Sequence, residues 1–274
     1  MTRWRHIPRA GLLAAMLLGA GAGAAMSAET MRVGGVGAAA GMLPHLFAIF
    51  DPSGGTKLEI IPSLGTSGGL RALSEGALDV AVSGRTLKPE ELSSGVTPVA
   101  AIRTPFGLVT SHPHPDGFKS SEVAGLFTSA KPTWKDGSPI LIILRPKSDS
   151  DTEVLGTLFL DMAAAIEQAR KRPDLSLAAT DQDNADLAER LPGSLTGSTF
   201  TQIKMERRNL RFIAIDGVEA SLENLMSRTY PFAKTLYFVL PAKKSPVAER
   251  FVAFLQSPAG QNALIATGSQ WIAQ

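Results

Sequence analysis

The sequence predicts an α/β protein built from two lobes. Two stretches have the same order, an apolar strand, a polar turn and the start of a helix, at 58–73 and again at 139–172. Between them, two adjoining extended runs at 96–102 and 106–111 are broken by Arg103-Thr104-Pro105, as expected of a segment that passes from one lobe to the other. A repeated strand-turn-helix unit with a connecting segment in the middle favours two similar lobes over a single sheet.

The first polar turn is Ser63-Leu64-Gly65-Thr66-Ser67-Gly68-Gly69. A glycine-rich turn that leads into a helix points several backbone N–H groups and the positive end of the helix dipole at one place, which suits an anion. Thr66 and Ser67 add neutral hydroxyl donors at the same place. We therefore expect this turn to form half of a binding site for an oxyanion.

The remaining elements alternate along the chain. Strands are predicted at 31–36, 57–62, 77–83, 139–144, 210–215 and 235–240, the last of these crossing back between the lobes; helices are predicted at 41–50, 122–128, 153–172, 221–226, 246–256 and 258–267. Asp181 is expected to cap a helix that carries 187–191, and 192–198 is expected to be another glycine- and hydroxyl-rich turn.

Length and charge limit the possible functions. The 274 residues, of which 44% are hydrophobic, suffice for one large domain or for two of roughly 120 residues each. The formal charge of +2 includes Arg3, Arg5 and Arg9; without them, 24 basic residues face 25 acidic ones. No basic stripe remains, so nucleic acid is not an expected partner.

The N-terminal segment resembles a cleaved secretory signal. Residues 1–11 are basic and contain no acidic residue, 12–26 are apolar, and small residues follow, so that residues 1–28 are the predicted signal peptide with cleavage at 25–28. The apolar stretch is short for a membrane span, although an anchor remains an alternative. The chain has no cysteine, hence no disulfide framework and no lipid-modifiable cysteine. A periplasmic location is expected.

The second polar turn, 145–152, carries its own anion chemistry. Arg145 can supply a charge-assisted fork, and Ser148, Ser150 and Thr152 add hydroxyl and amide donors. Asp149 or Asp151 can accept a proton from a ligand such as hydrogen phosphate, whereas a fully ionised anion such as sulfate would be repelled. The alternative is that Ser150 or Asp151 only caps the following helix, which would contribute about 1 kcal/mol.

The order of these segments resembles that of the periplasmic phosphate-binding proteins of ABC importers, over nearly all of the chain beyond the leader. The segments that carry the resemblance are 37–41, 63–69, 79–83, 145–152 and 230–232. The resemblance implies the class II periplasmic binding protein fold, in which each lobe is a mixed sheet flanked by helices and two crossover strands join the lobes. It also implies a ligand enclosed between the lobes, an ABC permease as partner, a monomer, no cofactor, no metal and no enzymatic activity.

Carried over position by position, the resemblance gives a set of ligand-binding residues. Where the family's first loop has a hydroxyl, Ala38, Ala39 and Ala40 offer only backbone amides. The second loop matches and places Thr66, Ser67 and Gly68 on the ligand. Ser83 stands where the family often has an aspartate. The family's Arg…Gly-Ser-Gly-Thr loop corresponds to Arg145…Asp149-Ser150-Asp151-Thr152, with one extra residue between the arginine and the serine; the expected contacts in this loop are Arg145, Ser148, Ser150, Asp151 and Thr152.

Three other functions share some of these motifs. The run 65–69 satisfies the G-x-S-x-G pattern of a serine hydrolase with Ser67 as nucleophile, but the last histidine is His114, too early for the order serine, acid, histidine. The run 35–40 satisfies G-x-G-x-x-A, yet Glu59, the acidic residue expected on the ribose, falls inside its strand. His112-Pro113-His114 lacks further ligands for a metal and is expected to be a solvated loop.

These observations combine into one expectation. Residues 29–104 and 234–274 form lobe I, 105–233 form lobe II, and phosphate or a related oxyanion is captured between them for import, with closure of the lobes on the ligand. The three alanines at 38–40 leave a different class open, a receptor-like domain that has lost its ligand and binds a protein partner.

Overall fold

The computed structural model describes residues 29–272 together with Met1, so the predicted signal peptide lies outside the described residues apart from Met1. In chain order the strands are β1 (Glu29–Gly35), β2 (Thr56–Ile61), β3 (Val80–Ser83), β4 (Thr97–Thr110), β5 (Leu141–Leu144), β6 (Ser176–Leu177), β7 (Ser194–Thr199), β8 (Arg211–Phe212), β9 (Ala233–Leu240) and β10 (Gln270–Ile272). The helices are the 3₁₀ turn η1 (Gly37–Ala39), α1 (Leu43–Phe50), α2 (Gly65–Ser74), α3 (Pro89–Ser93), α4 (Val123–Thr128), α5 (Ser150–Leu158), α6 (Met162–Ala169), α7 (Asp181–Arg190), α8 (Phe200–Met205), α9 (Leu222–Met226), α10 (Pro246–Gln256) and α11 (Pro258–Thr267).

The strands follow one another in the order β2-β1-β3-β9-β4-β7-β5-β6, with β8 and β10 also paired to β4. β1 runs parallel to β2 and β3, whereas β9 runs antiparallel to both β3 and β4, so the sheet is mixed. The predicted α/β class with mixed sheets flanked by helices is confirmed.

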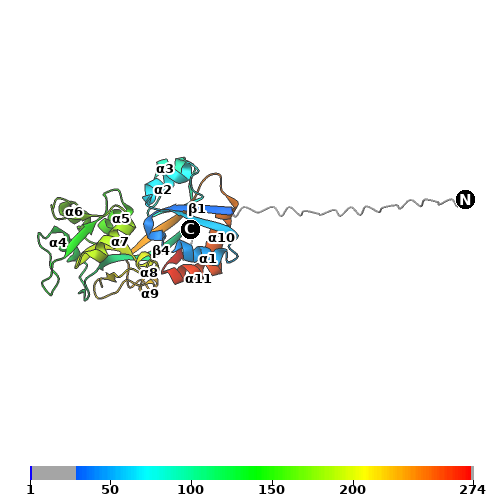
Figure 1. The fold of residues 1–274 in the computed structure, drawn as a ribbon. Helices are drawn as coiled ribbons and strands as arrows, with labels where there is room; N and C mark the ends of the chain where they lie inside the picture. The colour runs from blue at the N-terminus through cyan, green and yellow to red at the C-terminus, as the bar shows by residue number, and fades with distance from the viewer. Residues whose placement is uncertain (2–28, 273–274) are drawn as a thin grey trace.

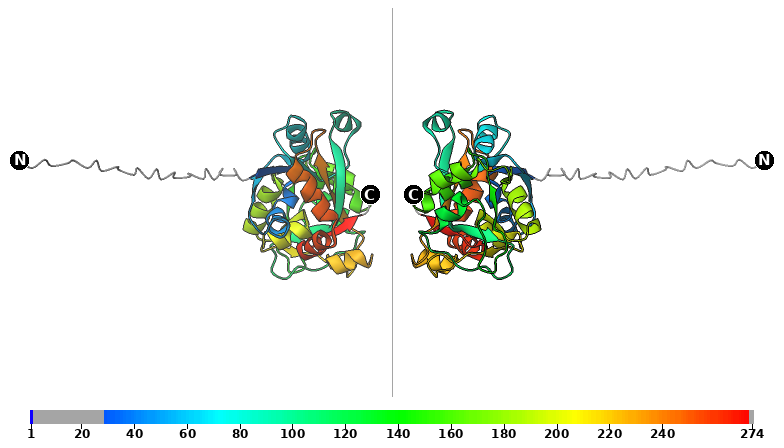
Figure 2. Two further views of the ribbon diagram at one scale, coloured as in Figure 1. Left: turned by 90° about the vertical axis from the view of Figure 1, so that its right-hand side faces the viewer. Right: turned by 90° about the vertical axis from the view of Figure 1, so that its left-hand side faces the viewer.

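Strand β4 belongs to both halves of the molecule. Its residues 97–105 pair with β9, and its residues 106–109 pair with β7. The two halves lie side by side, with α1, α2, α3, α10 and α11 around one and α4 to α7 around the other (Figure 1). Viewed from the two ends, the orange and red C-terminal helices lie in front in one view and the green helices in the other (Figure 2).

Each half has two hydrophobic cores, one on each face of its strands, because side chains alternate between the two faces of a strand. In β3, Val80 and Val82 face a core shared with α1, α10 and α11, while Ala81 faces the core under α2. In β5, Ile142 faces the core that includes α4, α5 and α6, and Ile143 faces the one that includes α7. The division into 29–104 plus 234–274 and 105–233 is consistent with these cores, and its boundaries stay a prediction.

The single helix predicted at 153–172 is wrong. The structure has two helices, α5 and α6, separated at 159–161. Asp161 adopts the left-handed conformation with φ of 59°, which an aspartate tolerates but which ends the run of helical hydrogen bonds. The break allows Phe159 and Met162 both to reach the same core while Leu160 points to solvent.

The turn predicted at 192–198 is also wrong, because most of it is the buried strand β7 between β4 and β5. Its hydroxyl groups are hydrogen-bonded inside the fold, so that burial does not leave them without partners. Ser194 donates to the Ala188 carbonyl at 2.8 Å and Thr196 donates to the Ile143 carbonyl at 3.0 Å. A hydroxyl-rich sequence thus predicts a turn here, but the segment forms an interior strand whose hydroxyl groups have hydrogen-bond partners.

Candidate functional site

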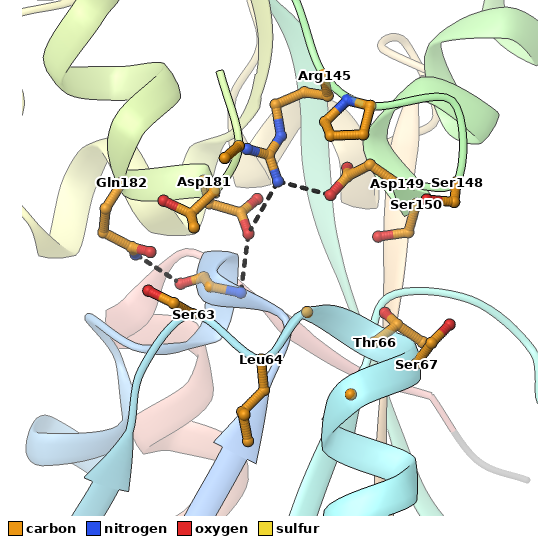
Figure 3. Close-up of a pocket in the computed structure, with 16 residues that line it drawn as sticks. Ser63, Leu64, Thr66, Ser67, Arg145, Ser148, Asp149, Ser150, Asp181 and Gln182 are labelled. Carbon is orange, nitrogen blue, oxygen red and sulfur yellow. Dashed lines mark hydrogen bonds and ion pairs between the residues drawn. The ribbon is translucent and has the colours of Figure 1, made fainter. Parts of the chain in front are cut away.

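The two polar turns predicted from the sequence line one cavity of about 190 Å³. Ser63 to Gly68, at the start of α2, form one side of it. Arg145, Pro146 and Ser148 to Ser150, at the start of α5, form the opposite side. Figure 3 shows Thr66 and Ser67 below the cavity and Arg145, Ser148, Asp149 and Ser150 above it. The start of each helix thus faces a shared space from a different half of the molecule.

The first turn is shaped by two residues with positive φ, Ser63 at 61° and Gly65 at 62°. α2 then begins at Gly65, and the hydroxyl groups of Thr66 and Ser67 in its first turn accept hydrogen bonds from the segment that follows β3. The Thr66 hydroxyl accepts from the Gly84 N–H at 2.9 Å, and the Ser67 hydroxyl accepts from the Arg85 guanidinium at 3.1 Å. Since each hydroxyl oxygen is used as an acceptor, its own proton is left to donate to a ligand.

The second turn holds a buried arginine whose donors go largely to the protein. The Arg145 guanidinium donates to Asp149 at 2.6 Å and to the Ala178 carbonyl at 3.1 Å, and its Nε has no hydrogen-bond partner among the described residues. Asp149 also caps α5, accepting from the Asp151 N–H at 2.8 Å. The expected alternative, a cap by Ser150 or Asp151, is therefore wrong.

A third segment, at the start of α7, lines the same cavity and was not predicted to bind. Asp181 accepts a hydrogen bond from the Gly37 N–H at 2.8 Å, and its other oxygen, Oδ1, is buried without a partner among the described residues. Its carboxylate lies 3.8 Å from Arg145. Burial, together with the nearby Asp151 carboxylate, raises the pKa of Asp181 to about 7. Thr180, rather than Asp181, caps α7.

Beneath the second turn lies a fully buried cation, Lys234 on β9. Its ammonium group donates to the Ser150 hydroxyl at 3.0 Å and to the Asp151 carboxylate. Burial alone would lower the pKa of Lys234, but the Asp151 and Asp181 carboxylates outweigh it and the pKa is raised. A Cβ on Gly84 would come within 2.5 Å of the Ser150 hydroxyl, so only glycine allows the end of β3 to approach α5 this closely.

Desolvation also raises the pKa of Asp149, with the neighbouring Asp151 adding to the effect and Arg145 opposing it. The cavity is thus bordered by carboxylates that do not ionise as readily as in water. A protonated carboxyl group donates a hydrogen bond, and an ionised one accepts a bond from a ligand that carries a proton.

Half of the predicted binding residues line this cavity: Thr66, Ser67, Gly68, Arg145, Ser148 and Ser150. The others do not: Ala38, Ala39, Ala40, Ser83, Asp151 and Thr152. Ala39 and Ala40 line a neighbouring cavity, and the Ser83 hydroxyl donates to the Arg85 carbonyl. Thr152 donates to the Pro146 carbonyl, and Asp151 holds Lys234. Contact of any of these residues with a ligand stays a prediction.

The motifs of the other functions have structural roles here. The Ser67 hydroxyl is bonded to Arg85 and to no histidine among the described residues. No group of three potential metal ligands occurs in the part of the chain that the structure describes. The loop at 112–114 is not simply solvated, because His112 is buried, stacks on Trp134 with ring centroids 4.8 Å apart and contacts Asp136 at 3.0 Å. Within the described residues, no helix is both long and apolar enough to cross a bilayer.

Comparison with known families identifies the family of this chain. The family described as "PBP superfamily domain" matches residues 20–259, and the chain belongs to that family. The family is one of substrate-binding proteins, whose members are periplasmic or otherwise extracytoplasmic, so the expected resemblance to periplasmic binding proteins is confirmed.

Solved structures of the same fold include proteins described as oxyanion receptors. One is a putative phosphate ABC transporter substrate-binding protein with bound phosphate from Clostridium perfringens, with TM-score 0.71, 17% identity and coverage of 89% of this chain and 100% of that one. A periplasmic molybdate-binding protein from Azotobacter vinelandii has TM-score 0.60, 13% identity and coverage of 89% and 99%. An ABC-type phosphate transport receptor from Vibrio cholerae has TM-score 0.57, 14% identity and coverage of 89% and 100%. No curated protein matches the chain.

Proposed function

We propose that this protein is an extracytoplasmic solute-binding protein that captures phosphate or a related oxyanion and delivers it to an ABC permease. The observation that carries the proposal is that the helix starts at 63–68 and 145–150, far apart in the chain, line one cavity. Backbone N–H groups and helix dipoles from both sides favour negative charge in that space. The solved relatives described as phosphate receptors support the same ligand class.

The charges around the cavity favour an anion that carries a proton. Arg145 attracts negative charge, while the carboxyl group of Asp149 faces the same space. A carboxylate can accept a hydrogen bond from hydrogen phosphate, but it repels sulfate or molybdate, which offer no proton at neutral pH. Phosphate is therefore the preferred ligand among these oxyanions.

Binding works by closure of the two halves around β4 and β9. An anion that contacts both turns stabilises the conformation in which they are close, and release to the permease follows when they separate. In this proposal the protein has no catalytic role, acts as a monomer, and is exported to the periplasm by the segment at 1–28, which is then cleaved. The lobes are 29–104 plus 234–274 and 105–233.

Calorimetric titration of residues 29–274 tests the proposal, with phosphate, sulfate and molybdate as separate ligands. We expect phosphate to bind in a 1:1 complex at least tenfold more tightly than sulfate. If no oxyanion produces a binding isotherm or a thermal shift, the proposal is wrong and the ligand-less, partner-binding alternative is favoured.

A further inference from the structure

A second cavity adjoins the one that we assign to the oxyanion. It has a volume of about 410 Å³, compared with about 190 Å³ for the polar cavity. It lies at the carboxyl ends of β1 and β2, and its lining includes the apolar Val36, Leu43, Ile60 and Ile61 and the acidic Asp183 and Glu206. Inorganic phosphate is not expected to occupy this cavity, because contact with apolar side chains does not compensate a small ion for the free energy of losing its hydration shell.

The two cavities share Gly37, Ser63, Thr180 and Gln182 as lining residues. The Gln182 amide donates to the Gly37 carbonyl at 3.0 Å and to Glu206 at 2.9 Å, and a Cβ on Gly37 would lie 2.5 Å from the Gln182 Oε1. Gln182 is half-buried and lines both cavities, so its side chain lies at their boundary.

The loop at 37–40 has the composition that a site spanning both cavities requires. Gly37 to Ala40 carry no side-chain donor, and Ala39 and Ala40 line the apolar cavity. Gly37 lines both cavities, and its N–H donates to Asp181, which lines the polar one. The same short loop therefore borders both cavities.

We propose that the ligand is an oxyanion with an apolar substituent, of the class of monosubstituted phosphoryl compounds such as alkylphosphonates. The charged head occupies the polar cavity between the two turns, and the hydrocarbon tail passes Gln182 into the apolar cavity. This inference rests on the proposed function and narrows its ligand class.

The test is a titration series of residues 29–274 with inorganic phosphate and with methyl-, ethyl-, propyl- and butylphosphonate. Burial of one methylene group raises affinity by about fourfold, so full burial of the three added methylenes would give about 60-fold, and we expect a rise of at least tenfold from methyl- to butylphosphonate. Lengthening the tail leaves the charge of the head unchanged, so the slope of the series reports on the apolar cavity alone.

Two variants on β2 locate the tail. Ile60 and Leu58 are both half-buried and pack against the same core, but of the two only Ile60 lines the apolar cavity. Ile60→Phe is expected to reduce the gain from methyl- to butylphosphonate to less than threefold. Leu58→Phe is the matched control and is expected to keep the gain of the unaltered protein.

The outcomes separate this inference from the proposed function. If phosphate binds and affinity stays flat or falls with tail length, the apolar substituent is rejected while the proposed function stands. If Ile60→Phe keeps the full gain, the tail lies elsewhere and the inference is likewise rejected. If neither phosphate nor any phosphonate binds, both proposals fail. The series on the unaltered protein decides the question even if Ile60→Phe does not fold.

Discussion

The Asp181 carboxylate on α7 accepts a hydrogen bond at 2.8 Å from the backbone N–H of Gly37, a residue from the other half of the chain. Asp181 thereby occupies a backbone donor of the loop at 37–40. It also lies close to Arg145, the only arginine that lines the cavity in the described part of the chain. An ionised Asp181 competes with a bound anion for the same positive potential, and a protonated Asp181 does not.

Asp181→Asn is predicted to raise the affinity for phosphate in a pH-dependent manner. Because burial raises the pKa of Asp181 to about 7, the wild-type side chain is mostly neutral at pH 5.5 and mostly ionised at pH 8.5. The ratio of variant to wild-type affinity should be near one at pH 5.5 and reach tenfold or more at pH 8.5. Calorimetry at both pH values measures it, and the titration of phosphate itself cancels in the ratio.

Asp186→Asn provides the control, since Asp186 lies on the same helix but pairs with Arg208 and does not line the cavity. Its affinity ratio should stay near one at every pH. A ratio for Asp181→Asn that does not change with pH would contradict the competing role of this carboxylate.

Asp181 is also predicted to make stability fall as the pH rises. Its folded-state pKa of about 7 exceeds the ordinary value of 3.8, so its contribution is fully present below pH 3.8 and is lost as pH rises to 7. The loss is at most about 4 kcal/mol in the free energy of unfolding. Urea unfolding between pH 4 and 8 should show that Asp181→Asn removes this part of the decline. If the free energy of unfolding falls equally with pH in the wild type and in Asp181→Asn, the effect is ruled out.

Removing both hydroxyls of the first turn should weaken oxyanion binding. Thr66→Ala with Ser67→Ala deletes two neutral donors at about 1 kcal/mol each, so phosphate affinity should fall by tenfold or more. Thr66→Ser keeps the hydroxyl that accepts from the Gly84 N–H and serves as the control. Unchanged calorimetric affinity in the double variant would remove this turn from the site.

Lys234→Met should destabilise the fold strongly. The change leaves Asp151 buried without its cation, and such a loss costs about 3–5 kcal/mol in the free energy of unfolding. Adding Asp151→Leu removes the unpaired charge as well and should recover most of the loss. Both values come from urea unfolding at pH 7. Equal stability of the Lys234→Met variant and the wild type would show that the ion pair contributes nothing.

The local parts of the site were predictable from sequence. The polar run 63–69 follows an apolar strand and contains the start of α2 at Gly65, so the helix begins earlier than the predicted turn implied; its polar residues are contiguous, and short-range patterns suffice to identify the run. The same holds for 145–152 and for α10 and α11, whose bounds at Pro246–Gln256 and Pro258–Thr267 match the prediction.

The charged residues brought together by tertiary structure were not predictable. Lys234 directly precedes the predicted apolar strand 235–240, and no local pattern indicates that it contacts Asp151, 83 residues away. The sequence predicts Asp181 to be a helix cap, because an acidic residue at a helix start is often one. Only the packing of α7 against the first loop reveals its contact with Gly37.

A crystal structure of residues 29–274 grown with phosphate tests the central claim most directly. The account predicts one phosphate within hydrogen-bond distance of both the Thr66–Ser67 turn and the turn at 145–150. A phosphate that contacts only one of these turns, or that binds on another surface, would contradict it.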